Sequence, residues 1–222
     1  MKVIITGATG MIGRGVLLEC LDHPAVTEVL VIVRRSTGEA HPKLNELIHK
    51  DFSNFTTLSE QLKGYDACFA TMGLSAAGKS EEEYKRLTYD MTLALAQILH
   101  ANNPNMTFNY VSGVGTDSTE EGRQMWARVK GKTENDLLAL GFKQAYMFRP
   151  GGIIPKRGVT SSTKLYQFFI DYFTWLLHLI AWINPNAITD TVKIGQAMIN
   201  SHLKGHDKSI VLPPDINKLA AL

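Results

Sequence analysis

The chain is poor in the features that mark several large classes of protein. Its 222 residues carry 23 Lys and Arg against 21 Asp and Glu, so the basic surplus of a nucleic-acid-binding protein is missing. Its two cysteines, Cys20 and Cys68, lie in apolar segments, as small core residues of a reducing compartment do. No signal peptide precedes the first expected strand, which indicates a soluble cytoplasmic protein. No nucleic-acid partner and no metal site are predicted.

What the sequence does have is a glycine-rich turn close to its start, with Gly7, Gly10 and Gly13 spaced three apart. A short apolar run over 3–5 predicts a buried strand before the turn, and the apolar spacing over 12–20 predicts a helix after it. Glycines here let the backbone approach a pyrophosphate, and the first helical N–H groups can bind it. The alternative is a turn that binds nothing, but three glycines would then cost chain entropy without a packing return.

Apolar runs and helical patterns alternate through most of the chain. Strands are expected at 28–33, at a run ending at Asp51-Phe52, and at 65–71, 107–111 and 145–148. Helices are expected behind Ser80, around 126–137, from Thr189 through Met198, and after Leu212. This alternation predicts an α/β Rossmann-like fold, a doubly wound parallel sheet of order 3-2-1-4-5-6 with helices on both faces. We expect one domain over 1–222, with a cap at 152–188.

Two motifs resemble a known superfamily. The segment Thr6-Gly-Ala-Thr-Gly-Met-Ile-Gly13 resembles the nucleotide-binding turn of short-chain dehydrogenases/reductases. The segment Trp126-Ala-Arg-Val-Lys130-Gly-Lys-Thr-Glu134 resembles the Tyr-x-x-x-Lys-Gly-x-x-Glu run of atypical members of the Tat-interacting-protein-30 type. Arg149-Pro150-Gly151 also matches those proteins, and the likeness covers roughly the first two thirds of the chain, the extent of the doubly wound unit.

The resemblance implies a catalytic corner formed by Ser112, which would orient a substrate carbonyl, and Lys130, which would bind the nicotinamide ribose. The expected proton-donating tyrosine is replaced by Trp126, whose indole cannot act as a proton acid near neutral pH. A core or pocket-wall position for this indole is an equally good interpretation.

The second strand ends at Arg34 and Arg35, where NAD-binding folds place a carboxylate for the ribose. Two guanidinium groups suit a 2′-phosphate, so NADP(H) is the predicted cofactor, although two solvated arginines are the simpler alternative. By resemblance, Asp51 and Phe52 would flank the adenine, and residues from Ala70 on would line the nicotinamide half. The expected cofactor-binding residues are Gly7, Thr9, Gly10, Met11, Ile12, Gly13, Arg34, Arg35, Asp51, Phe52, Ala70, Thr71, Met72, Lys130 and Pro150.

Residues 165–183 form a long apolar segment with a single polar stripe. The polar residues are Gln167, Asp171, Thr174 and His178, whose spacing places them along one side of a helix. An acid in the interior argues against a membrane span, and the missing Lys and Arg argue against a surface-bound membrane helix. We expect a cap over an apolar pocket or a homodimer interface, with peripheral membrane contact and core packing as the remaining interpretations.

Two functions of different classes fit these features. The first is an NADP(H)-dependent oxidoreductase acting on a small apolar substrate. The second is an NADPH-sensing regulatory protein with little or no catalysis, which Trp126 favours.

Overall fold

The computed structural model describes residues 1–160 and 187–222, so the predicted helix over 165–183 lies outside the described residues. A seven-stranded parallel sheet has the order β3-β2-β1-β4-β5-β6-β9. Its strands are β1 (Lys2–Thr6), β2 (Glu28–Val33), β3 (Leu44–Ile48), β4 (Ala67–Ala70), β5 (Thr107–Val111), β6 (Gln144–Phe148) and β9 (Ile210–Val211). The predicted Rossmann-like order is confirmed and extended by one strand.

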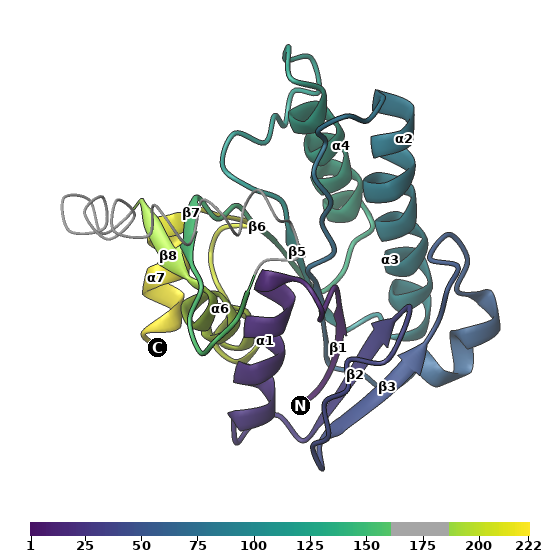
Figure 1. Cartoon of the computed structure of the whole chain (residues 1–222), viewed down its shortest axis with the longest axis vertical. Helices are drawn as coiled ribbons and strands as arrows, with labels where there is room; N and C mark the ends of the chain where they lie inside the picture. The colour runs from purple at the N-terminus through teal and green to yellow at the C-terminus, as the bar shows by residue number, and fades with distance from the viewer. Residues whose placement is uncertain (161–186) are drawn as a thin grey trace.

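Helices cover both faces of this sheet (Figure 1). One face packs against α1 (Met11–Asp22), α6 (Thr191–Lys204) and α7 (Pro213–Ala220). The other packs against α3 (Met91–Asn102) and α4 (Met125–Ala139), and a 3-10 turn, η1 (Thr56–Leu62), lies against α3. Strand side chains alternate between the two cores, so Ile5 faces α1 and Ile4 faces α3. This double burial explains why the strands are continuous apolar runs.

A second, two-stranded sheet pairs β7 (Gly152–Ile154) with β8 (Ile188–Asp190). These strands are the two ends of the segment expected to cap the site, and the cap itself stays a prediction. No helix among the described residues combines the length and apolar character needed to cross a bilayer. Burial raises the pKa of both cysteine thiols, which lie in the core as expected.

Two of the predicted boundaries are wrong. The third strand ends at Ile48, because the Asp51 carboxylate accepts a hydrogen bond from the Ser53 N–H at 3.0 Å and turns the chain. Asp190 rather than Thr189 caps α6, because α6 begins at Thr191 and the Asp190 carboxylate accepts from the Lys193 N–H at 2.7 Å.

The expected long helix behind Ser80 is divided into α2 (Glu81–Lys85), a π-helical turn η2 (Arg86–Asp90) and α3. The predicted cap is confirmed, since the Ser80 hydroxyl accepts from the Glu83 N–H at 3.2 Å.

Candidate functional site

The glycine turn joins β1 to α1 at the carboxyl edge of the sheet, and two of its glycines are required by packing. Gly7 has a φ of +77°, and a side-chain methyl there would lie 2.7 Å from the Thr71 carbonyl carbon. A methyl at Gly13 would lie 2.1 Å from the Gly7 oxygen. The turn is therefore pressed between α1 and the end of β4, as close strand-to-helix packing demands.

The start of α1 leaves hydrogen-bond donors open. Gly10 is the N-cap and supplies no side chain, and the first helical bond runs from the Arg14 N–H to the Gly10 oxygen at 2.8 Å. The N–H groups of Met11, Ile12 and Gly13 precede that bond, and no side chain in the described part of the protein caps them. A pyrophosphate fits this arrangement, because it accepts several N–H bonds at the positive end of a helix.

The ends of β1 and β4 lie side by side, which places the predicted nicotinamide-side residues next to the turn. The Thr71 hydroxyl donates to the Thr6 oxygen at 2.6 Å, so this side chain holds the strand ends together. Ala70 is buried, whereas Met72 is partly exposed and Thr9 in the turn is exposed.

The residues predicted to bind the adenosine half differ in their exposure to solvent. Arg34 and Arg35 are exposed just past the end of β2, and neither has a hydrogen-bond or ion-pair partner among the described residues. Phe52 is only 6% exposed and packs edge-on against Phe55 with ring centroids 5.6 Å apart. Of the pair expected to flank the adenine, the structure therefore exposes Asp51 and places the Phe52 ring in the core.

Ser112 and Lys130 are brought together at the end of β5, as the resemblance implied. The Lys130 ammonium donates to the Ser112 carbonyl oxygen at 2.6 Å. Burial lowers the pKa of Lys130 to about 8, and the nearby Glu134 carboxylate opposes that shift. The next loop is held to β6 because the Val114 N–H donates to the Pro150 oxygen at 3.0 Å.

A buried ion pair, which was not predicted from the sequence, supports this corner. Glu134 is fully buried and accepts bonds from the Arg149 side chain, whose Nε lies 3.0 and 3.1 Å from its two oxygens. The Ser112 hydroxyl donates to Glu134 as well. The spacing of Glu134, one helical turn after Lys130, was the available signal. Arg149 was singled out as part of the Arg149-Pro150-Gly151 match, but nothing in the sequence indicated that it pairs with Glu134.

Trp126 stands in the first turn of α4, one turn before Lys130. Its ring packs against the loop after β5, since a methyl at Gly115 would lie 3.3 Å from the indole Cη2. Two tyrosines occur nearby in the core, Tyr110 on β5 and Tyr84 on α2, and burial raises the pKa of both phenols. Neither tyrosine belongs to α4, and both phenols are buried.

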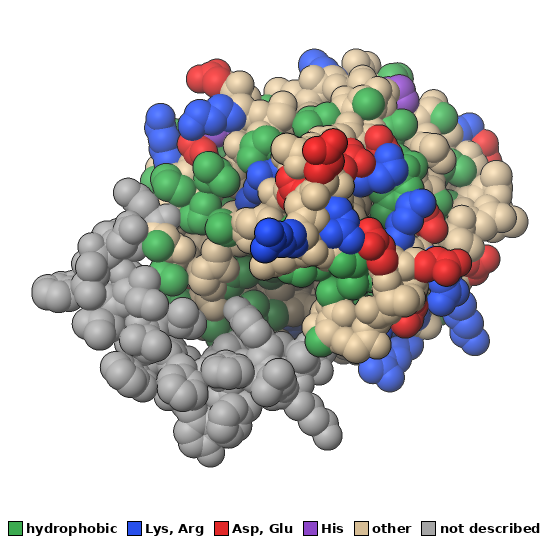
Figure 2. Space-filling view, turned by 90° about the horizontal axis from the view of Figure 1, so that it is seen from above, with side chains coloured by type: hydrophobic (Ala, Val, Ile, Leu, Met, Phe, Trp, Pro, Cys, Tyr) green, Lys and Arg blue, Asp and Glu red, His purple; other side chains and the backbone are tan. Residues whose placement is uncertain are grey.

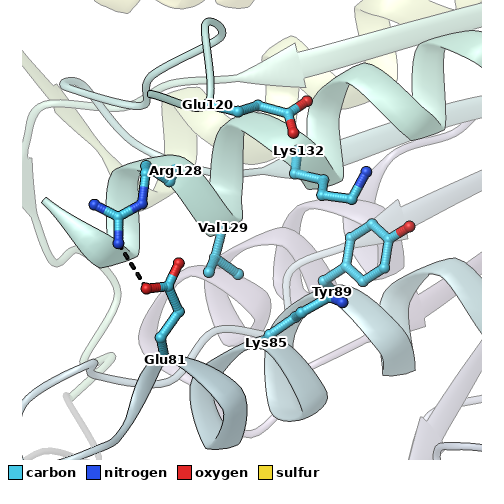
Figure 3. Close-up of a pocket in the computed structure, with 7 residues that line it drawn as sticks. All are labelled: Glu81, Lys85, Tyr89, Glu120, Arg128, Val129 and Lys132. Atoms are coloured by element: carbon cyan, nitrogen blue, oxygen red, sulfur yellow. Dashed lines mark hydrogen bonds and ion pairs between the residues drawn. The ribbon is translucent and has the colours of Figure 1, made fainter. Parts of the chain in front are cut away.

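A separate small pocket of about 210 Å³ lies between α2, η2 and α4 (Figure 3). Its charges are largely compensated: Arg128 pairs with Glu81 at 2.6 Å, and Lys132 pairs with Asp136 at 2.9 Å. The Lys132 ammonium also lies 5.3 Å from the centre of the Tyr89 ring. The pocket shares no residue with the predicted site.

Comparison with known proteins agrees with this geometry. The model of the NAD dependent epimerase/dehydratase family matches residues 3–125, more than half of the chain and the part that carries the glycine turn. The chain belongs to this family. It is similar to the mitochondrial protein FMP52 of Candida albicans, with 26% identity over 99% of this chain and 98% of the relative. The corresponding Aspergillus fumigatus protein is 28% identical over 98% and 93%.

Among solved structures, an oxidoreductase of the short chain dehydrogenase/reductase family from Burkholderia thailandensis superposes with a TM-score of 0.64. It covers 90% of this chain and 84% of its own, at 16% identity, so the likeness shows the fold alone. The family match confirms membership of the atypical short-chain dehydrogenase/reductase superfamily, and this family implies a nicotinamide cofactor. The closer likeness to the Tat-interacting-protein-30 type stays a prediction.

The comparisons correct one expectation. The fungal relatives are named as mitochondrial proteins, so the predicted cytoplasmic location is wrong.

Proposed function

We propose that the protein is an NADP(H)-dependent oxidoreductase acting on a small apolar substrate. Two observations carry the proposal: the N-terminus of α1 is open, and Arg34 and Arg35 follow the neighbouring strand β2 with no partner among residues 1–160 and 187–222. A phosphate at the ribose 2′ position would gain bidentate contacts there, whereas a 2′-hydroxyl would not.

Apolar side chains at the carboxyl edge support the substrate class. Leu74 follows β4, Val114 follows β5 and Leu212 follows β9, and they are 46%, 53% and 43% exposed. Ligands of doubly wound folds bind outside this edge. Figure 2 shows one face of the molecule, on which hydrophobic side chains lie between charged side chains of both signs.

In this proposal Lys130, Ser112 and Trp126 bind or position the cofactor and carry out no hydride transfer themselves. The nicotinamide cofactor would supply the hydride, and Lys130 would hold a proton at Nζ and hydrogen-bond the cofactor ribose. Ser112 would hold the position of Lys130 through its carbonyl oxygen. Trp126 would form a wall of the site and supply no proton.

A second candidate is an NADPH-binding regulatory protein with little catalysis. The contact that favours it is the Ser112 hydroxyl, which donates its hydrogen to Glu134 and lies 3.2 Å from the Phe148 oxygen. A hydroxyl committed in this way has no hydrogen left for a substrate carbonyl.

Calorimetric titration with NADPH and NADH tests the proposal. The native protein should bind NADPH at least about tenfold more tightly, which corresponds to about 1.4 kcal/mol. The Arg34→Ala/Arg35→Ala variant should lose that preference and keep its affinity for NADH. Arg123→Ala, which removes another exposed arginine, is the control. Equal affinity for both cofactors in the native protein would refute the NADP(H) assignment.

Turnover separates the two candidate functions. NADPH oxidation by a panel of aliphatic and aromatic aldehydes and ketones should be measurable if the protein is an enzyme. Tight NADPH binding without turnover of any member of the panel would favour the regulatory protein.

A further inference from the structure

An ion pair joins the start of α1 to the loop after β2. Arg14 follows the last glycine of the turn, and its Nη2 pairs with Oε2 of Glu39. The two side chains are 34% and 28% exposed, so both can exchange partners with solvent or with a ligand. The pair connects the expected pyrophosphate turn to the loop that carries Arg34 and Arg35.

The loop is built to hold Glu39 in this place. Glu46 on β3 accepts from the Thr37 N–H at 2.9 Å and from its hydroxyl, and the Glu39 N–H donates to the Thr37 hydroxyl at 3.2 Å. Gly38, with a φ of +74°, allows the chain to turn between them. A carboxylate is thus directed back onto α1 by contacts within the loop.

Arg14, Arg34 and Arg35 belong to segments that follow the neighbouring strands β1 and β2 at their carboxyl ends. Thr6 of β1 is opposite Ile32 of β2. The glycine turn starts directly after Thr6, and Arg34 is two residues after Ile32, so both lie at the same end of the two paired strands. Arg34 and Arg35 have no partner among the described residues, whereas Arg14 has Glu39. A doubly charged phosphate competes well for a guanidinium held by a single exposed carboxylate, because charge-assisted bonds strengthen with the charge of the acceptor.

We propose that Arg14 is the third cation of the 2′-phosphate site and that Glu39 occupies it until the phosphate binds. The proposal rests on the proposed function, since it assumes an NADP(H) site at Arg34 and Arg35. On binding, the Arg14 guanidinium leaves the Glu39 carboxylate for the phosphate. Glu39 thereby lowers the affinity for the phosphorylated ligand and has no contact with the unphosphorylated one.

Two nucleotides that differ only in the 2′-phosphate test this without any enzymatic assay. Adenosine 2′,5′-bisphosphate and adenosine 5′-monophosphate are titrated by calorimetry into the native protein, Arg14→Gln and Glu39→Gln. Arg14→Gln should weaken bisphosphate binding about tenfold, the worth of one charged hydrogen bond, and leave monophosphate binding within about twofold. Glu39→Gln should strengthen bisphosphate binding several-fold and leave monophosphate binding unchanged.

Charge-matched controls remove ion pairs elsewhere. Arg157→Gln removes an arginine that contacts Glu19 and Asp22 near the other end of α1, and Glu60→Gln removes the exposed partner of Lys63. Both should bind the two nucleotides as the native protein does. Circular dichroism of each variant checks that it is folded.

The outcomes separate this inference from the proposed function. A native protein that binds both nucleotides equally defeats the NADP(H) assignment and the role of Arg14 with it. A native preference for the bisphosphate that survives Arg14→Gln defeats the role of Arg14 alone. Weaker monophosphate binding by Glu39→Gln would show that Glu39 holds the ribose hydroxyls, which overturns the assignment of Glu39.

Discussion

Replacing Glu134 with glutamine should destabilise the protein strongly although the change is nearly isosteric. Glutamine keeps an oxygen that can accept from the Ser112 hydroxyl, but it removes the negative charge that faces Arg149. The Glu134 side chain is fully buried and Arg149 is 14% exposed, so the guanidinium would be left without a counter-ion in a nearly dry place.

The burial of the pair determines how much unfolding free energy the substitution should cost. Removing one member of a buried ion pair costs about 3–5 kcal/mol. Arg149 keeps one bond to the Ser118 hydroxyl at 2.6 Å and some contact with solvent, so we expect the lower end, about 3 kcal/mol. For a domain of this size, that loss lowers the Tm by about 6–12 °C.

Urea unfolding followed by far-ultraviolet circular dichroism measures this cost. Glu60→Gln is the control, because its pair with Lys63 is 82% and 50% exposed and should contribute less than about 1 kcal/mol. The double variant Glu134→Leu/Arg149→Met should recover much of the loss, since apolar side chains can replace a buried pair. A loss below about 1 kcal/mol for Glu134→Gln would refute the idea that this pair holds the corner together.

Three further changes test the site. Gly13→Ala should cost at least about 2 kcal/mol in thermal unfolding, because its methyl would lie 2.1 Å from the Gly7 oxygen, whereas the corresponding methyl at Gly10 has 3.3 Å and should cost about 1 kcal/mol or less. The pKa of Lys130 is about 8 when folded and returns to its ordinary 10.5 when unfolded, so the unfolded chain binds the extra proton between these values. The free energy of unfolding should therefore rise from pH 8 to 10.5 in the native protein, and urea titrations of Lys130→Met should lack that rise. Trp126→Tyr should bind NADPH as the native protein does and gain carbonyl reduction by about 10²–10⁴-fold, measured as NADPH oxidation, if only the acid is missing.

Much of the fold could be predicted because its signals are local. Buried parallel strands are short apolar runs, and each run alternates with a helical pattern, so the order of six strands follows from chain order and handedness. The seventh strand was missed because β9 is only Ile210–Val211, too short to show any periodicity. The end of the third strand was misplaced because the turn at Asp51 depends on a side-chain bond to Ser53, which composition does not reveal.

The site was predicted less completely because its contacts join distant parts of the chain. Glycine spacing correctly predicted the turn between β1 and α1, since backbone geometry and close packing there require that residue type. Pairs such as Arg14 with Glu39 and Glu134 with Arg149 depend on where β2 and β6 end relative to the helices. No property of either residue alone indicates its partner.

Two side chains of α4 hold Ser112 in a fixed position. Its carbonyl oxygen is held by the Lys130 ammonium and its hydroxyl by the Glu134 carboxylate, and these two side chains come from consecutive turns of α4. The serine is therefore fixed at both ends before any ligand arrives. Such an arrangement is preorganised to place a ribose through Lys130, but the Ser112 hydroxyl has no hydrogen left for a bound carbonyl. A tyrosine introduced at position 126 would find Ser112 and Lys130 already in place. The rate of carbonyl reduction by Trp126→Tyr therefore shows whether a proton donor is all that this corner lacks.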